Sequence, residues 1–290
     1  MSDNIVMPRR CLADTWNSCC STHTSQVWLD QLDIAGIPLK GVPIHAANSD
    51  FLNVSEAAEK SVGTMTDSLL LPRRVLQPEA FGKIKGLGGL GYPQPNPKRE
   101  FSGFLPALFV SNELPENVFS FSFEDNRGLL TLGGVDERFP GEPVWSNVIP
   151  NTHGAWYVPA RINGIEIKAI IDTGSAAIVA PVAQAKELFA KLPQVEAREK
   201  DGVAYAVLKS EHSEEVPEID FDVGGKAFRL SKRATIYQQD DDGRPALSIT
   251  GQNSFTDNTW IVGALFLQDF VTVFDWDHKR VGFVPTHEYH

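Results

Sequence analysis

One stretch of the chain combines strand, turn and charge: Ala169-Ile170-Ile171-Asp172-Thr173-Gly174-Ser175-Ala176-Ala177-Ile178-Val179-Ala180-Pro181. An apolar run leads to a single carboxylate on a tight turn, and a second apolar run follows at once. Runs of Ile, Val and Ala are typical of buried strands. A carboxylate between such strands is costly to ionise unless it is hydrogen-bonded or shares its charge. The alternative is a surface hairpin in which Asp-Thr-Gly only makes the turn, because Asp and Gly dominate turns.

The composition is that of an acidic globular protein. The 290 residues fit one large β domain or two medium ones. A net charge of −11 argues against a phosphate-binding surface, so we expect no nucleic-acid partner. We expect no membrane span, because the sequence has no apolar run of about 18 residues. The first ten residues lack an apolar core, so they do not resemble a signal peptide.

The cysteines do not predict a disulfide framework or a metal site. Cys11, Cys19 and Cys20 are an odd set near the start, and two of them are adjacent. No other Cys or His cluster has ligand spacing, so we expect no zinc site. The acidic run 240–243 lacks the further spaced ligands of a calcium loop and predicts a solvated loop. We therefore expect neither a metal nor a cofactor.

Strand signals dominate the chain, and helical signals are few. Asn163-Gly164 between alternating runs is a strong hairpin signal. The helix predictions are 181–190, with Pro181 at the first helical position, and one turn at 55–60. Frequent short strands with little helix predict a mainly antiparallel β protein. The prolines of 140–154 predict a junction between two halves. The predicted strands are 27–36, 108–110, 119–123, 128–134, 156–162, 165–167, 219–223, 228–230, 259–267, 271–276 and 280–284.

A weak internal repeat suggests two halves built on one plan. Trp260-Ile261-Val262-Gly263-Ala264-Leu265-Phe266 resembles Gly86-Leu87-Gly88-Gly89-Leu90-Gly91-Tyr92. Each half would then need its own turn carboxylate. Gly263 follows Asp172 by 91 residues. A first-half carboxylate with the same spacing to Gly89 would lie before Met1.

These motifs together resemble the pepsin family of bilobal aspartic peptidases. Further segments carry the same resemblance: Leu130 to Asp136, Phe270 to Asp275, and Val281-Gly282-Phe283. Together the matching segments cover roughly residues 27–285. The resemblance implies a mainly β fold with two closed β-barrel lobes of the double-ψ type. It further implies an irregular or degenerate flap region in 1–20, a partial N-terminal lobe in 21–150 and a complete C-terminal lobe in 151–290 with the Asp-Thr-Gly turn.

In that family each lobe gives one Asp-Thr/Ser-Gly turn, and the two carboxylates hold a water. Like charges a few ångströms apart share a proton, so one carboxylate activates the water and the other polarises the scissile carbonyl. By resemblance Asp172 is one catalytic carboxylate and Thr173 belongs to a buried hydroxyl grip. Gly174 allows the backbone to approach a substrate closely, and Ser175 orients the carboxylate of Asp172 by hydrogen bonding. Peptides or proteins are the implied substrates.

The sequence departs from the family pattern in the first half. It holds no second Asp-Thr-Gly or Asp-Ser-Gly, and Asp14-Thr15-Trp16 has a bulky residue where Gly is needed. An ungapped match places the family's flap hairpin over 16–26, with Ser18-Cys19 where a Tyr-Gly pair usually lies. We therefore expect the flap to be absent or remade.

Three readings follow from the single turn. The first is an endopeptidase with weak or no activity from this chain alone, since the second carboxylate is missing. The second is an inactive relative that binds peptides or proteins. The third is a homodimer that pairs two copies of Asp172, although we expect a monomer because the first-half lobe occupies the place of a second copy. Family members are often secreted or vacuolar, and the sequence leaves the localisation open.

Overall fold

The computed structural model describes residues 11–18, 21–34, 37–46, 90–92, 104–111, 113–124, 127–151, 154–209, 215–253 and 257–286. The chain divides into two compact units. The N-terminal unit comprises Met1–Asp67 and Arg73–Leu114, and the C-terminal unit comprises Ser68–Pro72 and Pro115–His290. The helix turn expected at 55–60 lies outside the described residues, as do Cys19 and Cys20.

The N-terminal unit contains a three-stranded antiparallel sheet and one helix. The strands are β1 (Cys11–Ser18), β2 (Ser21–Ile34) and β3 (Ile37–Ala46), in the order β1-β2-β3. Strands β1 and β2 form a hairpin across the 16–26 region, in which Trp16 pairs with His23. Asp14 lies within β1 and pairs with Ser25, so it is a strand residue and not part of a turn.

The strand prediction for 108–110 is wrong. These residues end the helix α4 (Phe104–Val110). Leu105, Leu108 and Phe109 are buried, and their spacing of three and four is that of one helix face. The short apolar run therefore belongs to a longer helical pattern.

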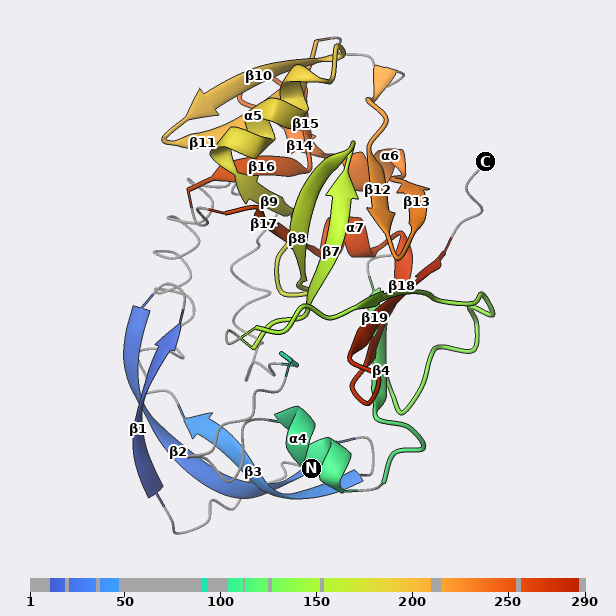
Figure 1. Ribbon diagram of the computed structural model, residues 1–290. Helices are drawn as coiled ribbons and strands as arrows, with labels where there is room; N and C mark the ends of the chain where they lie inside the picture. Colours follow the sequence, from blue (N-terminus) through green and yellow to red (C-terminus); the bar gives the residue numbers. More distant parts are fainter. Residues whose placement is uncertain are drawn as a thin grey trace. The chain divides into compact units, whose positions relative to one another are not determined.

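The C-terminal unit contains an 11-stranded sheet that carries the Asp172 turn (Figure 1). Its strand order is β13-β12-β7-β8-β17-β9-β16-β11-β15-β14, and β10 pairs with β11. The pairs β8–β17 and β9–β16 are parallel and the other pairs of this sheet are antiparallel. The strands are β7 (Tyr157–Ile162), β8 (Ile165–Ile171), β9 (Ile178–Pro181), β10 (Val195–Lys200), β11 (Val203–Leu208), β12 (Asp220–Val223), β13 (Lys226–Arg229), β14 (Ile236–Gln239), β15 (Pro245–Leu247), β16 (Ile249–Gln252) and β17 (Thr259–Val262).

A second, five-stranded sheet joins distant segments of the same unit. Its order is β5-β4-β18-β19-β6, so strands from before residue 150 pair with the last two strands of the chain. Thr272 pairs with Phe121, for example, and Gly282 pairs with Trp145. The strands are β4 (Val118–Glu124), β5 (Arg127–Leu132), β6 (Val144–Asn147), β18 (Phe270–Asp275) and β19 (Arg280–Pro285).

The structure confirms the mainly antiparallel β prediction and its main turn. Asn163 and Gly164 both have positive φ, 44° and 79°, as the two-residue hairpin between β7 and β8 requires. The Asn163 side chain also accepts a hydrogen bond from the backbone N–H of Asp220, 2.7 Å away. This bond fixes the hairpin against the start of β12.

The helices of this unit are short. They are α5 (Val182–Ala190), α6 (Lys232–Thr235) and α7 (Ala264–Leu267). Helix α5 confirms the prediction for 181–190, except that Pro181 precedes the helix with an extended ψ of 138°. Pro181 is the last residue of β9, where it pairs with Gln252, so it cannot be helical. None of the helices in the described part of the chain is long and apolar enough to cross a bilayer.

Aromatic rings fill the core of the C-terminal unit. Phe119 of β4 stacks on Phe274 of β18 with ring centroids 4.6 Å apart, and Trp156 meets Phe274 edge-on at 5.1 Å. Edge-on and stacked pairs of this kind add to the free energy gained from burial. The two sheets are thereby joined by packing, because Trp156 directly precedes β7.

A buried carboxylate, that of Asp136, links the segment between β5 and β6 to the five-stranded sheet. Asp136 is 7% exposed and accepts hydrogen bonds from Ser122 of β4 and from the Arg138 guanidinium. The Arg138 hydrogen bonds, opposed by burial and helped by Ser122, lower the pKa of Asp136 to about 2. Asp136 therefore stays ionised, and keeps these bonds, well into acid.

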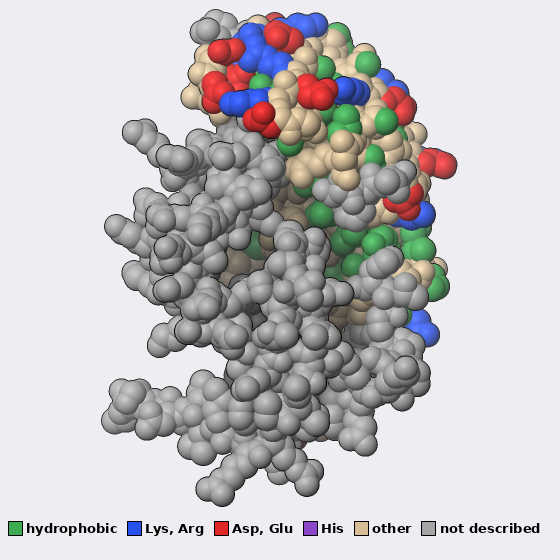
Figure 2. All heavy atoms as spheres, turned by 90° about the vertical axis from the view of Figure 1, so that its left-hand side faces the viewer, with side chains coloured by type: hydrophobic (Ala, Val, Ile, Leu, Met, Phe, Trp, Pro, Cys, Tyr) green, Lys and Arg blue, Asp and Glu red, His purple; other side chains and the backbone are tan. Residues whose placement is uncertain are grey.

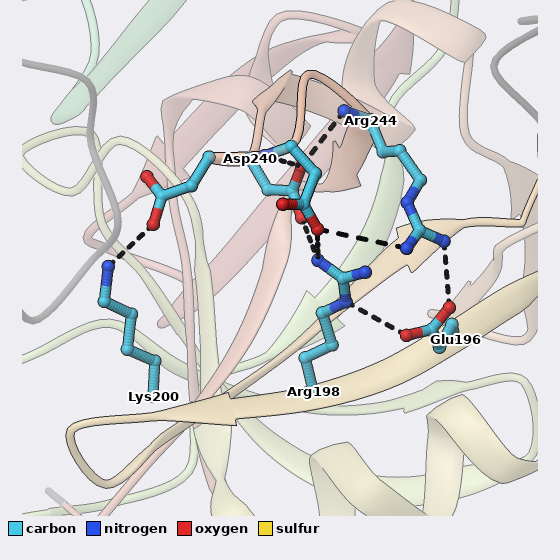
Figure 3. Close-up of polar contacts among 7 residues, drawn as sticks. Glu196, Arg198, Lys200, Asp240 and Arg244 are labelled. Carbon is cyan, nitrogen blue, oxygen red and sulfur yellow. Dashed lines mark hydrogen bonds and ion pairs between the residues drawn. The ribbon is translucent and has the colours of Figure 1, made fainter.

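A second cluster of charges links β10 to the loop between β14 and β15 (Figure 3). Arg198 of β10 contacts Asp240, whose side chain is only 4% exposed, and lies 2.7 Å from Asp242. Hydrogen bonds to Asp242, together with ion pairs to Glu196 and Asp240, raise the pKa of Arg198. At the same end of the unit, Figure 2 shows acidic and basic side chains intermixed. The expectation of a solvated acidic loop is wrong for Asp240, because Arg198 neutralises it.

We expect the stability of the protein to depend on Asp136 in acid. The folded pKa of about 2 lies below the ordinary value of 3.8, so ionised Asp136 stabilises the fold fully above about pH 4. That stability is lost as the pH falls towards 2. Asp136→Asn should lower the urea midpoint at pH 5 and flatten its fall between pH 4 and 2. The exposed Asp277 supplies the control variant Asp277→Asn. If the urea midpoint of Asp136→Asn fell between pH 4 and 2 as steeply as that of the wild type, this role of Asp136 would be contradicted.

The charge cluster predicts unequal effects of two neighbouring aspartates. Asp240→Asn should lower the urea midpoint at pH 7, because it leaves the partly buried Arg198 without its most buried partner. Asp241→Asn should lower it much less, since Asp241 is 81% exposed and pairs with Lys200 at the surface. If the urea midpoint fell equally in the two variants, the burial of Asp240 would not contribute to the stability of the fold.

Candidate active site

The Asp172 turn connects β8 to β9 and crosses the end of β17, which lies between these two strands. Strand β17 pairs with β8 on one side, where Val262 lies opposite Ile171, and with β9 on the other, where Ile261 lies opposite Val179. The chain therefore arrives along β8, passes over the end of β17 and returns along β9 (Figure 1). The backbone N–H of Asp172 donates to the carbonyl of Val262 at 3.1 Å, which ties the start of the turn to β17.

Both carboxylate oxygens of Asp172 accept a hydrogen bond from within the turn. The N–H of Gly174 donates to Oδ1 at 2.9 Å, and the hydroxyl of Ser175 donates to Oδ2 at 2.6 Å. Asp172 is half-buried. A carboxylate has about four acceptor positions, so further positions remain for a water or a substrate. The turn therefore holds the carboxylate in one orientation and leaves it able to accept a proton.

The four predicted site residues lie together on this turn. A Cβ at Gly174 would lie 3.1 Å from Asp172 Oδ1, so glycine gives the N–H its close approach. Thr173 is half-buried, and its part in a hydroxyl grip stays a prediction. The structure thus gives Gly174 and Ser175 as hydrogen-bond donors to Asp172, and their catalytic use stays a prediction as well.

Gly263 supports the turn from beneath, at the end of β17. A Cβ there would come within 2.5 Å of the carbonyl oxygens of both Ser175 and Ala177. The N–H groups that follow, of Ala264 and Leu265, donate to the carbonyls of Ser175 and Ala176 at 2.7 and 2.9 Å. These bonds end the strand.

The strand predicted over 259–267 is therefore wrong after Val262. The chain turns at Gly263 into helix α7, because its next N–H groups bind the Asp172 turn and not a neighbouring strand.

Sequence reasoning missed one contact of β17. Trp260 is fully buried, and its indole N–H donates to the side-chain oxygen of Gln184 in α5 at 2.9 Å. A buried indole N–H needs such a partner. The Trp itself is the only signal in the sequence, because Gln184 is 76 residues away along the chain.

The described residues hold no group of three or more His, Cys, Asp or Glu side chains that is able to bind a metal. Asp14-Thr15-Trp16 lies in the N-terminal unit and Asp172 in the C-terminal unit. Of the first-half repeat, only Leu90 to Tyr92 is described, and these residues are not in a strand.

Comparison with known proteins gives the family. A model of the eukaryotic aspartyl protease family matches residues 73–286. The chain is 30% identical over 270 residues to secreted aspartyl protease 1 of Malassezia globosa, covering 92% of this chain and 60% of the relative. It is 25% identical to pepsin II-2/3 of Oryctolagus cuniculus and 27% identical to cathepsin D of Rattus norvegicus, covering 70% and 69% of this chain.

The chain is thus a member of the eukaryotic aspartyl protease family, which the sequence motifs had predicted. It spans 60%, 54% and 52% of the lengths of the three relatives. The mainly β fold of the structure is the one expected for this family.

The close contact at Gly263 predicts a large effect for a single methyl group. Gly263→Ala should cost ~1–3 kcal/mol of unfolding free energy, because backbone carbonyls cannot move aside as a flexible side chain would. Gly134→Ala is the matched control, since nothing lies within 4 Å of a Cβ built there. Urea unfolding followed by tryptophan fluorescence measures both, and a neutral Gly263→Ala would contradict the described packing under the turn.

Proposed function

We propose that Asp172 is one of the two carboxylates of an aspartic endopeptidase site that cleaves peptide bonds in acid. The observation that carries this proposal is the turn itself. Gly174 and Ser175 each donate to one oxygen of Asp172, and β17 supports the turn from below. This arrangement supports a carboxylate that removes a proton from a water, the step that makes the water a nucleophile.

We further propose that the residues of this sequence supply only one of the two carboxylates. A lone carboxylate can orient a water, but it lacks the shared proton and the partner that polarises the scissile carbonyl. The sequence holds a single Asp-Thr/Ser-Gly turn. The chain by itself should then bind peptides at the Asp172 turn and hydrolyse them weakly or not at all.

Peptide binding without turnover is a second candidate function, favoured by the same single turn. Residues 151–290, which we propose as the lobe that carries the turn, would then act as a recognition module for peptides or proteins. A monomer is the proposed state of the chain. Sedimentation tests it, because a homodimer that brings two copies of Asp172 together would restore a pair of carboxylates.

The experiment compares cleavage and binding in one set of variants. For the wild type and Asp172→Asn, cleavage of a denatured protein would be measured between pH 3 and 5. The binding of peptides from that protein would be measured by calorimetry. Asp201→Asn is the control, because Asp201 is exposed and its φ of 51° is one that Asn adopts readily. We expect binding with negligible cleavage, and weaker binding in Asp172→Asn only.

Two results would contradict these proposals. Efficient cleavage that disappears in Asp172→Asn would overturn the single-carboxylate proposal and keep the catalytic role of Asp172. Binding that is equal in the wild type and Asp172→Asn, or measurable cleavage that is equal in both, would overturn the role of Asp172 itself.

A further inference from the structure

Strand β10 is joined to the 11-stranded sheet through β11 alone. Among the residues that the structure describes, β10 pairs only with β11. Strand β11 in turn meets β15, where Val207 pairs with Ala246, and β16, where Ala204 pairs with Gly251. An outer strand with one neighbouring strand opens at a lower free-energy cost than a central strand. Side-chain contacts therefore determine how firmly β10 is held.

The charged side chains of β10 lie beside a small apolar cluster. Tyr205, Val207 and Ala246 are buried and pack together. In the antiparallel register Arg198 lies opposite Tyr205, and Glu196 lies opposite Val207. Opposite residues point to the same face of a sheet, so the charges and the cluster share one face. Arg198 is only 19% exposed, as expected of a side chain whose aliphatic part lies against apolar neighbours.

Ion pairs join this face of β10 to the loop between β14 and β15 (Figure 3). Three alternate residues of β10 point to this face, and each of them binds a charged residue of the loop. The pairs are Arg198 with Asp240 and Asp242, Glu196 with Arg244, and Lys200 with Asp241. The strand is thus linked to a loop with which its backbone does not pair.

The carboxylates of this cluster differ in their access to water. Glu196, Asp241 and Asp242 are exposed, whereas the Asp240 side chain is buried. Oδ1 of Asp240 accepts hydrogen bonds from the backbone N–H groups of Asp242 and Arg244, both at 3.0 Å, so Asp240 also holds its own loop together. Protons from an acid solution therefore reach the three exposed carboxylates directly.

Two further acidic groups lie near β10. Glu199 points to the other face of the strand, where it pairs with Lys186 of α5 at 2.5 Å. Asp201, in the turn after β10, is exposed and interacts electrostatically with Lys200. Both are carboxylates and lose charge in acid as well, so neither replaces the ion pairs to the loop.

The exposed pairs stabilise the hairpin only while their carboxylates are ionised. Hydrogen bonds from Arg244 and Arg198 hold the pKa of Glu196 below its ordinary value of 4.5, and one from Lys200 holds the pKa of Asp241 below 3.8. A carboxylate whose pKa is lowered in the fold stabilises that fold above the ordinary pKa and stops doing so as the pH falls through the lowered value. These pairs are therefore complete above about pH 4.5 and weaken below it.

We propose that the ion pairs between β10 and the loop form an acid-released cover over the apolar cluster. At neutral pH they hold β10 and the loop together. In acid the three exposed carboxylates take up protons, while Arg198, Lys200 and Arg244 keep their positive charges and repel one another. Strand β10 then detaches, and the side of the cluster that it shields becomes accessible. This inference does not depend on the proposed peptide site.

The test measures local opening by amide hydrogen exchange and mass spectrometry at pH 7 and pH 3, with rates corrected for the intrinsic effect of pH. We expect the protection of residues 195–200 to fall about tenfold at pH 3, the effect of losing several surface ion pairs together. The protection of 157–162, which form β7 in the same sheet, should change little.

A double variant separates the cover from general acid unfolding. Glu196→Gln with Asp242→Asn removes two charges without acid and nearly keeps the side-chain shapes. It should lower the protection of 195–200 at pH 7 and leave little further fall at pH 3. Glu166→Gln is the matched control, because Glu166 pairs with Arg161 at 2.9 Å on the exposed β7–β8 hairpin. This control should leave 195–200 as protected as in the wild type.

Three results would overturn the proposal. The first is protection of 195–200 that is equal at pH 7 and pH 3 in the wild type. The second is an equal fall over 157–162, in acid or in the double variant, because the whole unit would then open and not β10. The third is a double variant that keeps the wild-type protection of 195–200 at pH 7, since the exposed carboxylates would then not hold the strand.

Discussion

The packing of Gly263 under the Asp172 turn is the constraint on which the site depends. The flanking strands β8 and β9 do not pair with each other at this point, because β17 lies between them. The turn must therefore cross the end of β17, and only a glycine leaves room for the carbonyls of Ser175 and Ala177. With its backbone held there, the turn can direct one N–H and one hydroxyl at the carboxylate. The orientation of Asp172 is thus set by a backbone contact made 91 residues further along the chain, as the numbering of Asp172 and Gly263 shows.

Two aspartates of the described residues at the five-stranded sheet, Asp136 and Asp275, have a pKa below the ordinary value. Asp136 is held by Arg138 and Ser122. For Asp275, burial acts to raise the pKa, but hydrogen bonds from the His278 backbone and side chain and from Arg280 outweigh it and lower the pKa. Arg280 also lies over the Trp145 ring at 3.9 Å, so the pair is part of the packing of β19 on β6. Both carboxylates support the five-stranded sheet, which joins the segment 118–147 to the end of the chain. Both carboxylates therefore stay ionised at a lower pH than an ordinary aspartate, and they keep their bonds to this sheet there.

The sequence predicted what is local and missed what depends on distant partners. The Asp172 turn, the Asn163-Gly164 hairpin and the helix after Pro181 follow from residue types within about ten positions of one another. The short runs at 108–110 and 263–267 were misassigned as strands, because a few apolar residues do not distinguish a helix from a strand. The pairing of β4 with β18 and the bonds Arg198–Asp240 and Trp260–Gln184 join residues that are far apart in sequence. No local pattern specifies such partners.

The central claim is that one carboxylate of this chain, Asp172, is positioned and open for chemistry on a bound peptide. A peptide that carries an epoxide tests this most directly, because a positioned carboxylate opens the ring and forms an ester that mass spectrometry can locate. At acid pH we expect the ester on Asp172, competed away by the unmodified peptide, while exposed carboxylates such as Asp277 stay free. Labelling spread over the exposed carboxylates, with Asp172 unmodified, would contradict the account.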